Sequence, residues 1–180
     1  MTMSRPLDDV PEPDGADDKE VYAFYGLAAY AGQVLEKGLV NLVAALHTDG
    51  LSITRAQFDT LFDKFDSSTF GQLVNAARAR IEIPTETEAL LSEVLTRRNW
   101  LVHDFFAHHS VAFTTDPGRA KMIVELRTLV DIFQRCDREV ETLCMPILAR
   151  RGVTEERVHE TEKRMMREYR AATNETSSDL

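Results

Sequence analysis

The feature that most constrains the fold of this chain is an unbroken heptad pattern of apolar residues in its C-terminal half. Eight apolar residues follow one another at alternating steps of four and three: Met122, Leu126, Leu129, Phe133, Cys136, Val140, Leu143 and Ile147. This spacing places all of them on one side of a helix about seven turns long. A helix with so long an apolar seam needs other helices to cover it. The pattern therefore predicts a helical bundle, and it also allows pairing with a second copy of the chain.

Five further stretches have helical periodicity, and capping or turn residues separate them. Thr54, Thr69 and Thr85 are each followed three residues later by Gln or Glu, which is the capping-box pattern that starts a helix. The sequence predicts helices at residues 18–47, 54–65, 69–80, 85–109, 117–150 and 154–172. Because no stretch alternates as a strand does, the predicted fold class is all-α, an antiparallel bundle of five or six helices.

The charge and the two ends of the chain set the expected organisation and location. Residues 1–17 are rich in proline and acids, and we expect a disordered acidic leader there, one helical domain at 18–173 and a disordered tail at 174–180. The net charge of −9 comes mainly from these ends, so the helical body is close to neutral but can still hold a local positive site. The N-terminus does not resemble a signal peptide, and no apolar run could span a bilayer. We therefore expect a soluble cytoplasmic protein with no membrane partner.

The two cysteines, Cys136 and Cys144, lie in one predicted helix. Their spacing puts them about 12 Å apart along that helix, so they cannot form a disulfide without breaking it. Neither has a second cysteine or a histidine at zinc-site spacing. We expect two small core residues that stay reduced.

The candidate site lies at residues 97–103, inside the helix predicted at 85–109. In helical projection Arg98 falls near the centre of the apolar face, while Asn99 and His103 lie one turn apart at its edge. A charged side chain at such a position is costly unless it is paired, hydrated in a cleft or bound to an anion. Arginine binds phosphate through a planar fork of donors, and histidine can transfer a proton near neutral pH. Together these groups fit RNA cleavage without a metal, in which the 2′-hydroxyl is the nucleophile.

Structural interpretations of the same residues stay open. Arg98 could be a buried arginine paired with an acid such as Glu125 or Asp131, and His103 could be an ordinary histidine at the edge of a helix. A cluster of histidines and an acid could instead hold zinc or iron. The residues of that alternative metal site are His103, Asp104, His108 and His109. It is the less favoured alternative, because adjacent histidines on a helix point about 100° apart and no known metal-binding pattern is present.

The segment Arg98-Asn99-Trp100-Leu101-Val102-His103 resembles the motif of the HEPN superfamily. In that motif an arginine is followed by a polar residue and, after four to six intervening residues, by a histidine. Members are all-α proteins. Many are dimeric, metal-independent RNases that act as toxins or in phage and stress defence, and others are non-catalytic binding or scaffold domains.

The resemblance implies specific roles for the residues of this chain. It implies catalytic roles for Arg98, Asn99 and His103, in a cleft shared by two protomers, and we expect Arg97 and Trp100 to contact the RNA. The implied protein needs no metal and no cofactor, and its partners are a second copy, RNA and a protein inhibitor or antitoxin. A shared cleft also suits the geometry, because Arg98 and His103 point about 140° apart around one helix.

Two functions follow as expectations. The first is a HEPN-like, metal-independent endoribonuclease of toxin or defence type that acts as a homodimer. The alternative is a non-catalytic helical protein for dimerisation or partner binding, in which Arg98 and His103 have structural roles.

Overall fold

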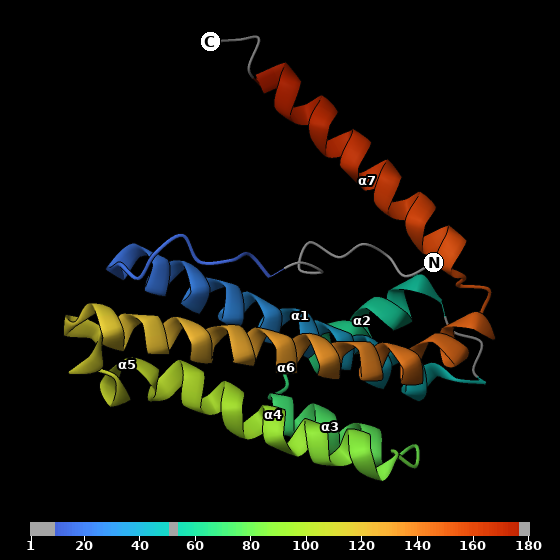
Figure 1. Ribbon diagram of the computed structural model, residues 1–180. Coiled ribbons are helices and arrows are strands. Elements are labelled where there is room, and N and C mark those ends of the chain that lie inside the picture. The colour runs from blue at the N-terminus through green and yellow to red at the C-terminus, as the bar shows by residue number, and fades with distance from the viewer. Residues whose placement is uncertain (1–9, 51–53, 177–180) are drawn as a thin grey trace.

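Two long helices form the centre of the computed structural model, which describes residues 10–50 and 54–176. They are α1 (Asp18–Thr48) and α6 (Asp116–Ala149), and they lie side by side along most of their length (Figure 1). They run in the same direction, since contacts join their starts (Ala16 to Arg119) and their ends (Asp49 to Arg150), so the expected antiparallel arrangement is wrong for this pair. All eight residues of the predicted apolar seam on α6 are buried except Leu143, which is half-buried. The seam is thus covered largely within a single copy of the chain, by the buried side of α1.

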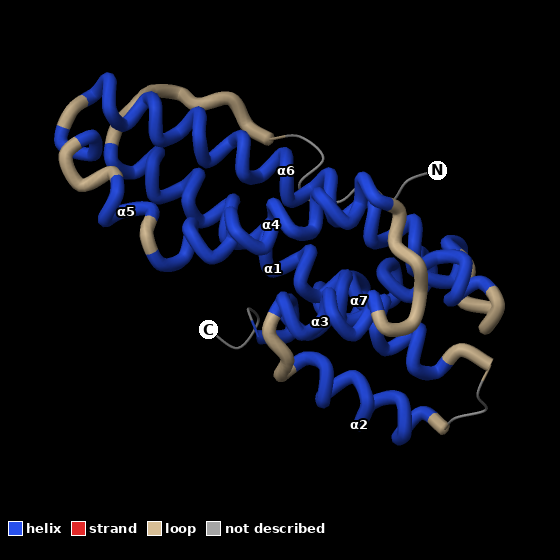
Figure 2. The backbone as a smooth tube through the Cα atoms, turned by 90° about the horizontal axis from the view of Figure 1, so that it is seen from below, coloured by secondary structure: helices blue, strands red, loops and turns tan. Residues whose placement is uncertain are grey.

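Shorter helices surround this pair. α2 (Arg55–Asp66) and α3 (Phe70–Arg78) pack on α1, and α4 (Thr85–His103) packs on both α6 and α1 (Figure 2). α5 (Phe105–His108) follows α4 directly, and a short 3-10 turn, η1 (Ala112–Thr114), leads into α6. The all-α fold class is confirmed, because no strand occurs in the described ranges. None of the helices in these ranges is long and apolar enough to cross a membrane.

The capping boxes at Thr54 and Thr69 are confirmed, but the third one is not. Thr54 and Thr69 each accept a hydrogen bond from the backbone N–H three residues later, and the Gln at that position caps the threonine N–H in return. Thr85 is instead the first helical residue of α4, and Pro84 occupies the N-cap without a side-chain hydrogen bond. The fixed φ of Pro84 favours this start without help from a hydroxyl.

The helix predicted at 85–109 is divided in two, so the described chain has seven α-helices and not five or six. Asp104, with φ −122° and ψ −18°, separates α4 from α5. The break lets Phe105 reach the core, where it lies 5.8 Å from the ring of Tyr25, and lets Phe106 pack 4.9 Å from the same ring. Apolar periodicity continues across residue 104, so the pattern alone could not show the break.

At the two ends of the described chain, residues 10–17 contact the bundle and the last helix is longer than predicted. Residues 10–17, part of the expected leader, run along the bundle. Arg127 of α6 donates two hydrogen bonds to Glu12, at 2.6 and 3.0 Å, and Arg119 Nε donates to the Ala16 carbonyl at 2.7 Å. At the other end α7 (Glu155–Thr176) extends beyond its predicted limit of 172. The outer parts of both expected disordered segments, residues 1–9 and 177–180, lie outside the described residues.

The two cysteine thiols should be unreactive in the folded protein. Burial raises the pKa of the Cys136 thiol to about 12 and that of Cys144 to about 11, from an ordinary value of 9.0. Because only the thiolate is nucleophilic, iodoacetamide at pH 8 should label neither residue in the native state and both in guanidinium chloride. Mass spectrometry of the alkylated protein measures this, and rapid native labelling of either cysteine would contradict the packing.

The same pKa shifts set the direction of a pH effect. The unfolded thiols ionise near pH 9, whereas the folded ones keep their protons until about pH 11–12. Their contribution to stability is therefore constant below pH 9 and decreases as the pH rises from 9 towards 12.

Candidate functional site

Arg98 is held between α4 and α1 by an ion pair with Glu36. Its Nη2 donates to Glu36 Oε2 at 3.2 Å, and the two side chains are 32% and 23% exposed. The arginine stem lies against α1 beside Gly32, one turn before Glu36, where a Cβ would be in ordinary contact at 3.8 Å from Arg98 Cγ. Arg98, the charged residue on the apolar face of α4, is therefore paired with an acid, and the ion pair is partly exposed to solvent.

The acid that pairs with Arg98 is neither of the two expected from the sequence. Glu125 instead bonds to His109, with 2.8 Å between its Oε2 and the imidazole Nε2. The sequence expectation was wrong because it sought the partner on the long helix α6, whereas Arg98 reaches α1. Glu36 could have been suspected, because it lies beside the buried residues Leu35 and Leu39 at the edge of the apolar side of α1.

The side chains of Asn99 and His103 are exposed and lie one turn apart on α4, where they follow Arg98 in the sequence. His103 is the last residue of α4, and Asp104 ends the helix behind it. Within the described part of the chain, the side chains of Asn99 and His103 make neither a hydrogen bond nor an ion pair. An amide and an imidazole that could bind an incoming ligand thus lie on the same helix as the fixed guanidinium, about 100° and 140° around the helix from Arg98.

Exposed apolar side chains lie beside these groups. Tyr22, Gly26 and Tyr30 are spaced four residues apart and form one strip along the N-terminal half of α1. Tyr22 packs against Phe106 of α5 with ring centroids 5.7 Å apart, and Val102 of α4 is exposed one turn after Arg98. We call Tyr22, Gly26, Tyr30 and Val102 the α1–α4 face. Exposed apolar side chains that recur along one side of a helix are typical of an interface.

Arg97 and Trp100, the two expected RNA contacts, are not grouped with Arg98. Arg97 is exposed and lies 3.6 Å from the carboxylate of Glu93 on the same helix. Trp100 is half-buried and packs edge-on against Phe105, with ring centroids 5.3 Å apart. Residues two apart on a helix point about 200° apart, so Trp100 lies on the opposite side of α4 from Arg98. Its role in this structure is packing.

His108 and His109, in and directly after α5, belong to an aromatic cluster. The rings of His108 and His109 lie 4.9 Å apart, and each contacts Trp100 edge-on. No group of three or more His, Cys, Asp or Glu side chains in residues 10–50 and 54–176 is arranged to hold a metal ion. The alternative metal site at residues 103–109 therefore has no preformed cluster of that size.

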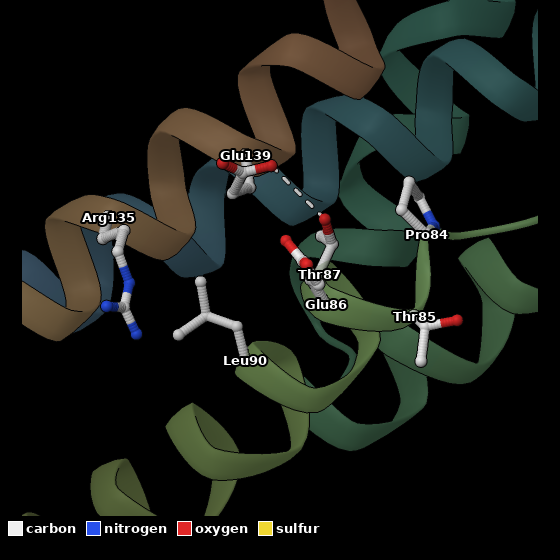
Figure 3. Close-up of a pocket in the computed structure, with 7 residues that line it drawn as sticks. All are labelled: Pro84, Thr85, Glu86, Thr87, Leu90, Arg135 and Glu139. Carbon is white, nitrogen blue, oxygen red and sulfur yellow. Dashed lines mark hydrogen bonds between the residues drawn. The ribbon is translucent and has the colours of Figure 1, made fainter.

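A separate pocket lies at the other end of α4, against α6 (Figure 3). It is lined by Pro84, Thr85, Glu86, Thr87, Leu90, Arg135 and Glu139. The buried Thr87 hydroxyl donates to Glu139 Oε2 at 3.3 Å. Sixteen helical residues, about 24 Å, separate Thr87 from His103, so this pocket is not part of the candidate site.

Comparisons of the chain with family models, with curated proteins and with solved structures find no match. The HEPN resemblance of residues 98–103 thus stays a prediction from the motif.

Proposed function

We propose that this protein is a HEPN-like, metal-independent endoribonuclease that acts as a homodimer. The observation that carries the proposal is the arrangement at the end of α4. The guanidinium of Arg98 is fixed by α1 yet partly exposed, and the unpaired Asn99 and His103 follow it on the solvent side. These are the groups that cleavage of a phosphodiester requires in the absence of a metal.

The reaction uses the RNA 2′-hydroxyl as nucleophile. His103 accepts the proton of the 2′-hydroxyl while its oxygen attacks the adjacent phosphorus, and the bond from phosphorus to the 5′-oxygen then breaks. A protonated imidazole supplies the proton that the leaving 5′-oxygen needs. Arg98 stabilises the negative charge that develops on the phosphate oxygens, and Asn99 holds a substrate oxygen. The products are a 2′,3′-cyclic phosphate and a 5′-hydroxyl.

A second copy of the chain would complete the site. Within one copy Arg98 and His103 point about 140° apart around α4, so one helix does not direct both at the same phosphate. Pairing across the α1–α4 face would bring Arg98 of one copy towards His103 of the other. The exposed Tyr22, Tyr30 and Val102 support this arrangement, because tyrosines and apolar residues are favoured in interface cores.

Glu36 adds a feature that the motif alone does not contain. Its carboxylate accepts a hydrogen bond from Arg98 Nη2, a donor that an RNA phosphate would use. A phosphate offers the same planar pair of acceptor oxygens and can replace the carboxylate without moving the arginine far. In the proposed enzyme Glu36 therefore keeps Arg98 oriented until RNA binds.

The second candidate function is non-catalytic partner binding. The Arg98–Glu36 ion pair favours it, because this contact ties α4 to α1 and is by itself a sufficient structural role for Arg98. In that case the α1–α4 face binds a protein partner. For a nuclease of toxin type, a protein inhibitor or antitoxin that covered the same face would block both dimer formation and the site.

The products and the metal requirement of any cleavage test the proposal. Incubation of the purified protein with single-stranded RNA should give cleavage that continues in excess EDTA, since the nucleophile comes from the RNA itself. The new 3′ ends should carry a 2′,3′-cyclic phosphate or a 3′-phosphate, as shown by mass spectrometry of the fragments. Activity that EDTA abolishes and a divalent ion restores would instead indicate a metal-dependent enzyme.

A further inference from the structure

The exposed side of α1 is symmetric in sequence about Gly26. Alanine lies three residues before and three residues after this glycine, and tyrosine lies four residues before and four after. All of them point away from the core, and none is charged although 28% of the residues in the chain are. With Gln33 they form one uncharged strip between Lys19 and Lys37, which we call the symmetric strip. It consists of Tyr22, Ala23, Gly26, Ala29, Tyr30 and Gln33.

Nothing in this copy of the chain requires a glycine at residue 26. A Cβ there would meet no atom within 4 Å, and its φ is not positive, since the positive-φ residues of the described chain are Gly50 and Gly152. Glycine in the middle of a helix is unfavourable relative to alanine, but it allows another backbone to come close. Tyr22 and Tyr30, one turn before and after it, are 54% and 45% exposed. Gly26 therefore offers a second helix a close contact between two aromatic side chains.

We propose that α1 pairs with α1 of a second copy in antiparallel orientation, with the two-fold axis of the dimer at Gly26. Each residue then faces the residue that is equally far from Gly26 in the opposite direction, so Lys19 faces Gln33 of the second copy. The two glycines face each other at the axis, where the absence of side chains lets the helices come close. This inference rests on the homodimer of the proposed function and gives that dimer a register.

The tyrosines and alanines of the symmetric strip fit each other in this register. Around α1, Tyr22 and Ala29 lie on one side of Gly26, and Ala23 and Tyr30 lie on the other. A two-fold axis that passes between the helices and perpendicular to them exchanges the copies and keeps these sides. The ring of Tyr22 therefore packs on Ala29 of the second copy, and the ring of Tyr30 packs on its Ala23. Large residues meet small ones, as a self-complementary interface between two copies requires.

The lysines at the two ends of the symmetric strip favour the antiparallel orientation. In this register Lys19 lies within one turn of Glu36 of the second copy, and Lys37 lies within one turn of its Asp18. A parallel pair would place each lysine opposite itself, and facing like charges are unfavourable. Lys37 also contacts Asp66 in its own copy, but its side chain is 58% exposed and can reach a further acid. Charge complementarity thus points to a second copy in this orientation.

The same pairing brings the two candidate sites to one side of the dimer. α4 runs opposite to α1, because Arg98 bonds to Glu36 whereas Phe106, just after α4, packs against Tyr22 (Figure 1). Both contacts lie on the side of α1 that carries Tyr22. Since the two-fold axis keeps that side, α4 of both copies lies on it, and His103 is nearer the axis than Arg98 is. Arg98 and His103 of both copies thus share one side of the dimer, as the shared cleft of the proposed enzyme requires.

Two variants of the full chain, Lys19→Cys and Gln33→Cys, test the register. Each variant alone, and the two chains co-expressed, are treated with a short bismaleimide; the wild type, whose Cys136 and Cys144 are buried, is the blank. In the antiparallel pair residue 19 faces residue 33, whereas identical positions lie about 21 Å apart along the helices. The co-expressed chains should give a covalent dimer on a denaturing gel, and each variant alone should give at least tenfold less. Efficient linking of either variant with itself, or equal absence of linking in all samples, would overturn the pairing.

Gly26→Leu tests the contact at the axis separately from the fold. Within one copy the position is exposed and leucine is the better helix former, so the helix content by circular dichroism should not fall. In the dimer the two leucines would collide, and the dissociation constant by sedimentation equilibrium should rise at least tenfold. Ala89→Leu, on the side of α4 opposite to Arg98, is the matched control and should leave the constant unchanged. An unchanged constant in Gly26→Leu would contradict the close contact.

These experiments also separate the α1 pairing from the nuclease proposal. Linking of residue 19 to residue 33 in a protein that does not cleave RNA would support the pairing and contradict the nuclease. RNA cleavage that His103→Ala abolishes, in a protein whose residues 19 and 33 do not link, would support the nuclease and overturn the pairing.

Discussion

Replacing His103 with alanine should lower the rate of RNA cleavage by about 10²–10⁴-fold and leave the thermal stability almost unchanged. The loss is large because the imidazole is the proposed proton donor and acceptor of the reaction. The stability should change by less than about 0.5 kcal/mol, because the side chain is exposed at the last residue of α4 and makes no hydrogen bond within the described chain. Cleavage assays and thermal melts on the same preparation measure both quantities.

Arg98→Ala should also abolish cleavage, but with a measurable cost in stability. Truncation leaves Glu36 without its cation, and because the pair is partly exposed we expect a loss of about 1–2 kcal/mol. A fully buried pair would lose about 3–5 kcal/mol. Glu36→Gln is the matched control, since it breaks the same ion pair and keeps the guanidinium. It should reduce stability in a similar way and keep cleavage activity, and Arg97→Ala should change neither.

Several outcomes of these variants would contradict the nuclease proposal. A severely destabilised Arg98→Ala beside a His103→Ala with unchanged activity would leave a scaffold whose arginine only joins two helices. Equal activity loss in Arg98→Ala and Glu36→Gln would indicate that the ion pair, and not the free guanidinium, matters. Mixing Arg98→Ala with His103→Ala tests the shared cleft. A hybrid dimer of the two variants has one site with both Arg98 and His103 intact, so activity should partly return. No recovery in a mixture shown to contain hybrid dimers would exclude that site.

Gly118→Ala should destabilise the bundle by more than about 3 kcal/mol or prevent folding. A Cβ at residue 118 would lie 2.0 Å from the carbonyl oxygen of Ala112 and 2.6 Å from its carbonyl carbon. Both atoms belong to the backbone of η1, so no side chain can rotate to make room, and the turn between α5 and α6 would have to move. The displacement would also disturb the cap of α6, where the Gly118 N–H donates to Thr115 Oγ1 at 3.2 Å.

Gly71→Ala is the control for this substitution. A Cβ at Gly71, in the first turn of α3, would lie 3.7 Å from Leu95 Cδ2, an ordinary packing distance. Alanine is the better helix former, so this change should stabilise the protein by up to about 1 kcal/mol. Denaturant titrations of both variants measure the difference. Equal midpoints for Gly118→Ala and the wild type would show that η1 does not pack against α6 as described.

The sequence predicted the helices wherever periodicity and capping residues determine them. The seam from Met122 to Ile147 and the capping boxes at Thr54 and Thr69 are local signals, and the helices that they predict are present. The break at Asp104 was not predictable in this way. It depends on where Phe105 and Phe106 find space beside α1, and this is a property of the packed fold, not of the segment.

For the candidate site, the residue types and their spacing on α4 could be read from the sequence, but their surroundings could not. Arg98 was expected to be paired, hydrated or bound to an anion, and its partner was sought on the wrong helix. Glu36 is 62 residues away in the chain, and only the close approach of α1 and α4 at Gly32 brings the two together. In the same way, His103 is the last residue of α4 because the helix is interrupted at Asp104, and this position could not be predicted from the spacing of the motif.

The Arg98–Glu36 contact has a consequence for how RNA binding would respond to ionic strength. Affinity for nucleic acids normally falls with added salt because each bound phosphate releases cations that were condensed on the polymer, while the protein's arginine starts as a free charge. Here the arginine starts with a carboxylate as its own counterion. When a phosphate replaces that carboxylate, the exposed Glu36 attracts a cation in turn, and much of the release is cancelled. In the proposed enzyme Arg98 would thus contribute to the rate of cleavage while adding little to the salt dependence of binding.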